Sequence, residues 1–508
     1  MADVAEPGTV PPIRTTGHGS SPRRAVALRG WPSVQRFFWL LLALYVVKQC
    51  VFVFAFRPFS GHDEVAHFSY LQTVATEWRV PVLPELEAWR AAVRQGDEPA
   101  VDGFPDELYP YCDYALYWHC EPDKPQWALN PPRMVTYLGD YYPTGYQYGA
   151  NHPPLYYLVM TPLYWASDGL SPVAQHYLLR LAAIPFGMLT VAFAYGMSRV
   201  LFPADAFLAV TVPAVVAFQP QISYEAAMVN NDIVSIALYS AMLFLMILGI
   251  RDRFPYRVCL LLGTALGLGL LTKSNSLSAI PLIALAVVLS VGWRQVRAWL
   301  VRGSLLLLPA AVLAAPWYLF LYRTYGNLDG LDQIAALQSY WNKPAGTFFG
   351  MLLSWDFIVM RFKETWGEFG WRRIHLTSTL NWIIALPMLV AFAGLIRYLI
   401  VAGVARLTDR AEPSPRLERW QWLGVGMLGL TCVVAYLAII QFGTRFALTQ
   451  ARYFFPVVNA AALLLLFGLR TLIPRAYHAY AQGAVFASGV LLNLFLFIQY
   501  IIPHFNSL

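Results

Sequence analysis

The sequence predicts an all-α polytopic membrane protein with about eleven transmembrane helices, and three of its features support this prediction. Of the 508 residues, 58% are hydrophobic and only 13% are charged, whereas soluble domains carry about 25% charged residues. The mean hydropathy is +0.49. The apolar stretches are continuous runs of roughly 18–23 residues, the length that a helix needs to cross the hydrocarbon core of a bilayer. A soluble enzyme, a disordered chain, a disulfide-stapled module and a β-barrel porin are therefore excluded.

The apolar runs and the segments between them define the expected organisation. We expect membrane-spanning helices near 36–56, 177–200, 206–223, 230–250, 257–272, 275–292, 303–322, 378–400, 421–441, 453–469 and 480–502. These runs divide the chain into a disordered cytoplasmic tail (1–34), a first transmembrane helix (35–56), an extracytoplasmic loop with catalytic and juxtamembrane helices (57–176), transmembrane helices 2–7 (177–322), a second extracytoplasmic loop (323–377) and transmembrane helices 8–11 (378–508). The apolar stretch 153–166 is too short to cross and begins with two prolines, so we expect it to lie on the outer surface.

The distribution of basic residues predicts the orientation. With a cytoplasmic N-terminus, every inside loop carries arginines, as the positive-inside rule requires, and the C-terminus is extracytoplasmic. Acidic residues dilute the basic ones in the two long outer loops. The net charge of +7 therefore indicates orientation in a bacterial plasma membrane, and we expect no nucleic-acid partner. Cys112 and Cys120 lie in the first outer loop, on the side where disulfides persist, and we expect a local disulfide between them. A zinc site is disfavoured there because the spacing matches no standard pattern.

The first cluster of polar residues with chemical potential follows the first span. His62, Asp63, Glu64 and His67 stand at the start of an expected helix. Asp63 and Glu64 are four and three residues from His67, so all three side chains can converge on one patch. Such a group suits a general base or a divalent-cation site. The alternative is an Asp63 that only caps the helix, with surface charges beside it.

Two more polar clusters lie at the expected outer ends of the spans. His152 and Tyr156 close the first outer loop, where aromatic residues anchor helices at the headgroup level or stack on a sugar. Asn231 and Asp232 stand at the head of the fourth span with Glu225 and Asn230, and helix capping by Asn231 or Asp232 explains one of these four residues but not all of them.

Five cations stand on the side of the membrane where the positive-inside rule expects few. A cation there is costly unless it meets an anion, and a phosphate at the membrane surface would be such an anion. These residues are Lys273, Arg361, Lys363, Arg445 and Arg452.

The order of these motifs resembles the GT-C superfamily of membrane glycosyltransferases, which includes protein O-mannosyltransferases and aminoarabinose transferases. The matching pieces are Asp63-Glu64, the Pro-Pro-Leu-Tyr-Tyr segment at 153–157, Asp232, Lys273 and the Arg-Tyr-Phe-Phe-Pro segment at 452–456. The sequence looks most like an uncharacterised bacterial branch of that superfamily.

The resemblance implies a polyprenyl-phosphate-linked sugar donor and an envelope glycan, lipid or protein acceptor, both meeting at the lipid bilayer. It implies that Asp63 is the general base, that Glu64 assists it, and that Lys273 and Arg452 neutralise the leaving phosphate, with Arg445 or Arg361 in reserve. Some members of the superfamily need a divalent metal and others do not, so the resemblance leaves open a divalent cation held by Asp63, Glu64 and His67. A carrier or flippase, and a polymerase or ligase for lipid-linked saccharides, are the alternatives; a carrier needs polar groups in the middle of several spans.

Overall fold

The computed structural model describes residues 33–97, 99–111, 134–370, 372–408, 410–411, 413–447 and 449–506. The expected disulfide between Cys112 and Cys120 falls outside these residues. In the described part, the chain is a bundle of helices with two small antiparallel hairpins, as the all-α prediction requires. Each of the eleven predicted apolar runs falls on a helix. Nine helices of this part are long and apolar enough to cross a membrane, and two shorter apolar helices, α8 and α11, cover the other two runs.

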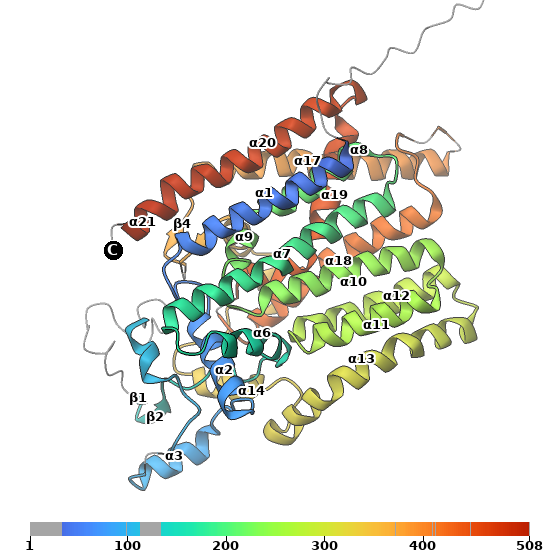
Figure 1. Ribbon diagram of the computed structural model, residues 1–508. Helices are drawn as coiled ribbons and strands as arrows, with labels where there is room; N and C mark the ends of the chain where they lie inside the picture. Colours follow the sequence, from blue (N-terminus) through green and yellow to red (C-terminus); the bar gives the residue numbers. More distant parts are fainter. Residues whose placement is uncertain are drawn as a thin grey trace, which may run out of the picture. The chain divides into compact units, whose positions relative to one another are not determined.

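The apolar helices form the bulk of the molecule (Figure 1). Their bounds are α1 Val34–Ala55, α7 Pro172–Leu201, α8 Ala206–Phe218, α10 Asp232–Asp252, α11 Tyr256–Leu270, α12 Ala279–Val291, α13 Val296–Tyr325, α17 Ser378–Leu407, α18 Arg419–Gly443, α19 Val458–Leu472 and α20 His478–Leu496. Short helical turns extend three of them: η2 Ser274–Ser278, η3 Ala451–Val457, η4 Arg475–Tyr477, the π-helical turn η5 Phe497–Ile501, and α21 Ile502–Asn506.

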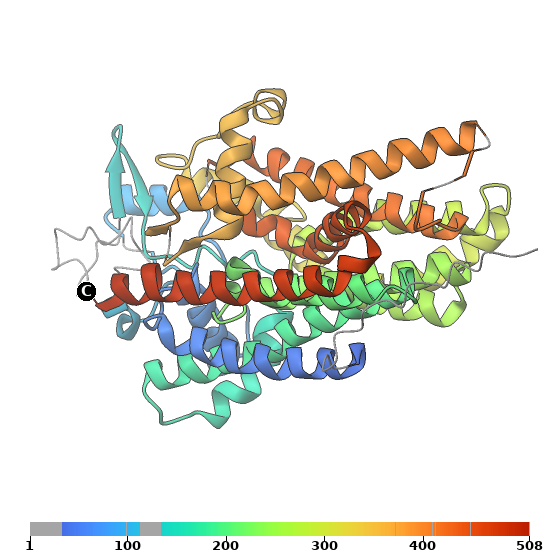
Figure 2. The same ribbon diagram turned by 90° about the horizontal axis from the view of Figure 1, so that it is seen from above.

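The remaining elements belong to the connections. They are α2 Glu64–Glu77, α3 Leu86–Arg94, η1 Asp106–Tyr111, β1 Met134–Tyr137, β2 Asp140–Pro143, α6 Leu155–Ala166, α9 Pro220–Glu225, α14 Leu331–Gln338, α15 Phe348–Leu352, α16 Trp355–Trp366, β3 Glu368–Phe369 and β4 Ile374–His375. Figures 1 and 2 show α2, α3 and the β1–β2 hairpin at the same end of the bundle as the end of α21. We call this the loop end.

The bundle is built around three interior helices, of which the short α8 has 11 of its 13 residues buried. In their most apolar stretches, α10 is 72% buried and α19, with η3, is 67% buried, whereas α20 is only 17% buried. Close helix contacts depend on glycine. A Cβ at Gly263 of α11 would lie 2.1 Å from the carbonyl oxygen of Leu306 in α13. Likewise, a Cβ at Gly468 of α19 would lie 2.1 Å from the carbonyl oxygen of Ala391 in α17. Small residues allow such backbone approach where lipid provides no hydrophobic drive between helices.

The segment that the sequence places on the outer surface is the short helix α6. It has 12 residues and contains Pro162, too few residues to cross about 30 Å of hydrocarbon. Its first N–H, that of Leu155, donates to the Leu271 carbonyl oxygen at 2.9 Å, which fastens α6 to the end of α11. Helix α7 begins at Pro172, five residues before the predicted span, because Ser171 caps it through the Ala174 N–H.

Candidate active site

Asp63 lies at the N-terminus of α2 but does not cap it. Its backbone is left-handed, with φ 57°, and its side chain makes no capping hydrogen bond. A capping residue usually has extended backbone that turns its oxygen toward the first free N–H groups. Here the carboxylate is turned away from them, which corrects the capping expectation. Asp63 instead accepts a hydrogen bond from the Tyr148 hydroxyl at 3.0 Å and forms an ion pair with Arg452.

Arg452 joins the two acidic residues at the loop end. It comes from η3, and its guanidinium contacts Asp63 through Nη2 and Asp232 of α10 through Nη1, the latter at 3.2 Å. Lys273, between α11 and η2, contacts the other oxygen of Asp232. We call Asp63, Asp232, Lys273 and Arg452 the charge quartet. It holds two negative and two positive groups, and its most exposed side chain is that of Asp63, at 18%.

Aromatic and imidazole rings lie beside the quartet. His67, one helical turn after Asp63, shares a hydrogen bond of 2.8 Å between its Nδ1 and the Tyr157 hydroxyl. The His67 ring lies 5.6 Å from the His152 ring in a stacked arrangement. On the other side, Lys273 Nζ stands 5.3 Å from the centre of the Tyr453 ring. The site is therefore a charged centre between flat rings.

The electrostatics of the site keep Asp63 ionised and the imidazoles neutral. Burial alone would raise the pKa of the Asp63 carboxyl, but the Arg452 guanidinium holds it below its ordinary value. Burial lowers the pKa of His67 to about 4, against the opposing attraction of Asp63 and Asp232. Burial and the nearby His67 lower the pKa of His152 to about 3.

Comparison with known protein families gives a match over part of this chain. The family described as dolichyl-phosphate-mannose-protein mannosyltransferase matches residues 152–328, a region that contains His152, Asp232 and Lys273. Over these residues, about a third of its length, the chain is similar to that family. No curated protein matches it in sequence.

The alignments with solved structures cover most of this chain. ArnT from Cupriavidus metallidurans aligns in its undecaprenyl-phosphate-bound crystal structure with 14% identity and a TM-score of 0.47, and in its apo structure with 15% identity and a TM-score of 0.44. Both alignments cover 93% of this chain and 74% of ArnT. The Archaeoglobus fulgidus oligosaccharyltransferase, in complex with zinc and sulfate, aligns with 12% identity and a TM-score of 0.39 over 89% of this chain and 52% of its own.

Glu64 lies in a separate ion-pair cluster. Its carboxylate accepts hydrogen bonds from Arg180 of α7 at 2.9 and 2.5 Å, from the Gly61 N–H at 2.7 Å and from the Val229 N–H at 2.8 Å. His176 Nε2 lies 3.0 Å away. The expected convergence of Asp63, Glu64 and His67 therefore fails for Glu64, because neighbouring residues at a helix start point in different directions. We call Glu64, His176 and Arg180 the sealed cluster, since none of their side chains is exposed.

The divalent cation considered from the sequence does not fit the residues present. In the described part of the chain, no three His, Cys, Asp or Glu side chains gather in a way that could hold a metal ion. Asp63 and Asp232 are already neutralised by Arg452 and Lys273, and Glu64 by Arg180. Cations at those carboxylates would compete with a metal ion for the same oxygens.

Three other predicted site residues make structural contacts. His62 is buried, with Nδ1 3.2 Å from Glu225 Oε1. Asn231 donates to the Thr272 carbonyl oxygen at 3.2 Å, which ties the start of α10 to the segment before Lys273. Tyr156, predicted to contact substrate, is fully buried in the core of the loop end. Its neighbour Tyr157 makes the hydrogen bond to His67 instead.

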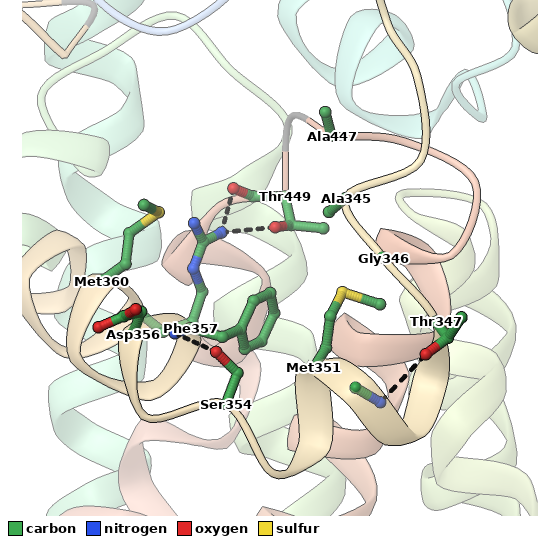
Figure 3. A pocket seen from close by; sticks show the side chains of 12 residues that line it. Ala345, Gly346, Thr347, Met351, Ser354, Asp356, Phe357, Met360, Ala447 and Thr449 are labelled. Atoms are coloured by element: carbon green, nitrogen blue, oxygen red, sulfur yellow. Dashed lines mark hydrogen bonds between the residues drawn. The ribbon is translucent and has the colours of Figure 1, made fainter.

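The remaining predicted cations do not contact the quartet. Lys363 is exposed, and the exposed Arg445 pairs with Asp332 at 3.3 Å. Arg361 is buried and pairs with Glu364 at 2.8 Å, while its other nitrogen donates to the Thr449 hydroxyl at 2.7 Å. A cavity of about 370 Å³ lies against Arg361. Figure 3 shows Thr449 and Ala447 across this cavity from Met351 and Ser354.

The sequence reasoning missed Arg180, Tyr148 as a partner of Asp63, and Glu364. Arg180 had a visible signal, because it is a charged residue inside a predicted span, and such residues are costly unless they are paired. Tyr148 and Glu364 had no comparable signal. Their partners lie 85 and 87 residues away along the chain, and only the fold brings them together.

Proposed function

We propose that this protein transfers a sugar from a polyprenyl-phosphate donor to a hydroxyl of an envelope acceptor, with inversion at the anomeric carbon. The observation that carries the proposal is the charge quartet, where one arginine bridges two carboxylates beside a lysine at the loop end. The matched family, whose description names a sugar linked to dolichyl phosphate, supports a lipid-linked donor.

Lys273 and Arg452 would receive the donor phosphate. Each now binds a carboxylate, so an arriving phosphate would share these cations with Asp63 and Asp232. Arginine and lysine hydrogen bonds to phosphate are charge-assisted and among the strongest in proteins. As the sugar–phosphate bond breaks, negative charge grows on the leaving phosphate, and the two cations stabilise that charge.

Asp63 would be the general base. The acceptor oxygen attacks the anomeric carbon, the bond from that carbon to the phosphate oxygen breaks, and the acceptor proton passes to Asp63. When the phosphate draws Arg452 away, Asp63 loses part of the attraction that now holds its pKa low, and it becomes a better proton acceptor. Glu64 suits this role poorly, because four hydrogen bonds already occupy its two oxygens.

The site would work on the extracytoplasmic face of a bacterial plasma membrane. We place the loop end outside because the basic residues of the chain concentrate in the opposite loops. The donor headgroup would then meet the quartet while its isoprenoid tail stays among the spans. The acceptor could be a glycan, a lipid or a protein of the envelope.

A transfer assay tests the proposal. Membranes containing the wild type or Asp63→Asn receive radiolabelled glucosyl, mannosyl and galactosyl undecaprenyl phosphate together with envelope acceptors. We expect transfer to fall by about 100- to 10,000-fold in Asp63→Asn, the usual contribution of a general base, with unchanged protein levels. Asp332→Asn, which removes an exposed carboxylate, should transfer normally. Full transfer by Asp63→Asn would refute the assigned base.

A further inference from the structure

Arg452 reaches the quartet from a segment that the second long loop holds in place. The three residues before it are Thr449, Gln450 and Ala451, and Thr449 and Ala451 are 1% and 2% exposed. Helix α16, in the loop 323–377, packs against η3, which begins at Ala451. The position of Arg452 therefore depends on what holds this short segment.

Two side chains of α16 bind the segment. Arg361 donates through one nitrogen to both the carbonyl oxygen and the hydroxyl of Thr449. Glu364 accepts the Ala451 N–H at 3.0 Å on one oxygen and Arg361 at 2.8 Å on the other. Together they satisfy backbone groups directly before Arg452, inside a buried environment where such bonds are strong.

The same pair is connected to the rest of the fold. Arg372 contacts Glu364 and also Glu368 at 2.9 Å. Glu368 is fixed through its backbone, which exchanges two hydrogen bonds of 2.9 Å with the Gln221 side chain of α9. Arg361 and Glu364 are thus anchored on one side and bind the Arg452 segment on the other.

We propose that Arg361 and Glu364 are positioning residues, which hold the segment 449–451 so that Arg452 faces Asp63 and Asp232. We call these two residues the α16 clamp. The effect of the clamp on sugar transfer rests on the proposed function, whereas its effect on the placement of Arg452 does not.

Ionisation of Glu364 gives the clamp a pH dependence. Burial and the nearby Glu368 carboxylate raise the pKa of Glu364 to about 7, against the attraction of Arg361 and Arg372 and the Ala451 hydrogen bond. Below pH 7, protonation weakens the bonds from Glu364 to Arg361 and to Ala451. A raised carboxyl pKa means that the folded state binds this proton more tightly than the unfolded chain. As the pH falls from about 7 to about 4.5, the contribution of Glu364 to the stability of the folded state therefore rises rather than falls. Protonation of Glu364 can therefore loosen the α16 clamp without unfolding the protein.

The test compares Glu364→Gln with the matched control Glu368→Gln in the full chain, in nanodiscs. Both remove one carboxylate from the same network, but only Glu364 touches the 449–451 segment. Phenylglyoxal modification of arginine, quantified on proteolytic peptides, reports how well Arg452 is held and needs no substrate. Arg180 in the sealed cluster is the internal reference.

We expect Arg452 to be modified about tenfold faster in Glu364→Gln, as the loss of a charge-assisted hydrogen bond suggests, with Arg180 unchanged. Thr449→Val, which removes only the hydroxyl acceptor of Arg361, should give a smaller increase and keeps the test open if Glu364→Gln fails to fold. Equal Arg452 reactivity in the wild type, Glu364→Gln and Thr449→Val would overturn the proposal, and so would an equal rise in Glu368→Gln.

The pH profile of transfer gives a second readout. In the wild type, kcat should fall as the pH drops through about 7, without a loss of thermal stability caused by Glu364. Glu364→Gln should abolish this fall in kcat. Glu368→Gln should move it to lower pH, because this variant lacks the neighbouring charge that raises the pKa of Glu364. If Arg452 reactivity responds as expected but no variant shows transfer, the clamp stands and the proposed function fails.

Discussion

Asp63 and Glu64 are adjacent in the sequence, yet they lie in two clusters with opposite properties. Every oxygen of Glu64 is occupied and no side chain of the sealed cluster is exposed. Asp63 keeps 18% exposure and shares its arginine with Asp232. A fully satisfied buried carboxylate can only hold the structure together, whereas a partly exposed one with a shared cation can exchange that cation for a ligand. Four variants test this difference, in order of decreasing effect.

The largest effect should come from Glu64→Gln. Removing one partner leaves the buried Arg180 charge uncompensated, which costs about 3–5 kcal/mol. We expect a corresponding fall in unfolding free energy, measured by denaturant titration of the protein in detergent. A double variant, Glu64→Met with Arg180→Met, should recover much of the loss, since it leaves no unpaired charge. The division into two clusters would be wrong if Asp63→Asn destabilised the protein as strongly as Glu64→Gln.

His67→Gln tests whether the buried His67 imidazole beside the charge quartet is neutral. Because the folded-state pKa of His67 is about 4, the unfolded chain binds more protons between pH 4 and pH 6.5, and stability rises with pH across that window. Replacing His67 should remove about 3 kcal/mol of this dependence. Thermal melts at several pH values measure the slope. An identical slope in wild type and variant would mean that His67 is charged in the folded protein.

Lys273→Gln probes the quartet. The loss of a charge-assisted bond to the donor phosphate should raise KM for the donor about tenfold. The change in kcat should be smaller, because a lysine that binds the phosphate equally before and during transfer contributes to binding and not to the chemical step. Steady-state kinetics with a fixed acceptor measure both constants. Lys343→Gln, at an exposed lysine of the second loop, is the control, and an unchanged donor KM in Lys273→Gln would remove this lysine from the phosphate site.

Tyr148→Phe should have the smallest effect. It removes one hydrogen bond from an uncharged hydroxyl to the ionised Asp63. The Arg452 ion pair stays, so we expect a loss at the low end for hydrogen bonds to charged groups, about 1.5 kcal/mol, and a roughly tenfold fall in transfer. Tyr137→Phe, in the exposed strand β1, controls for the loss of a hydroxyl. A change in Tyr148→Phe as large as that in Asp63→Asn would assign the proton transfer to the tyrosine rather than to the carboxylate.

The sequence was sufficient for the spans because burial in lipid imposes a long, continuous apolar run, as in α10 and α17. It also indicated the unusual charges, since the predicted orientation puts Lys273 and Arg452 on the outer side, where the positive-inside rule disfavours cations. It could not separate Asp63 from Glu64, because the left-handed backbone at Asp63 has no sequence signal. Nor could it show that Arg361 binds Thr449 instead of a phosphate, since that contact joins residues 88 positions apart.

The ion pair between Asp63 and Arg452 joins residues 389 positions apart, and this has a consequence for biogenesis. A membrane protein is inserted from its N-terminus as it is synthesised, so Asp63, Asp232 and Lys273 enter the bilayer surface before Arg452 exists. Until then the site carries one excess negative charge and lacks the bridge between its two acids. The charge quartet is completed only when the segment before α19 has been inserted, so a shorter nascent chain holds an acidic cluster rather than a balanced one.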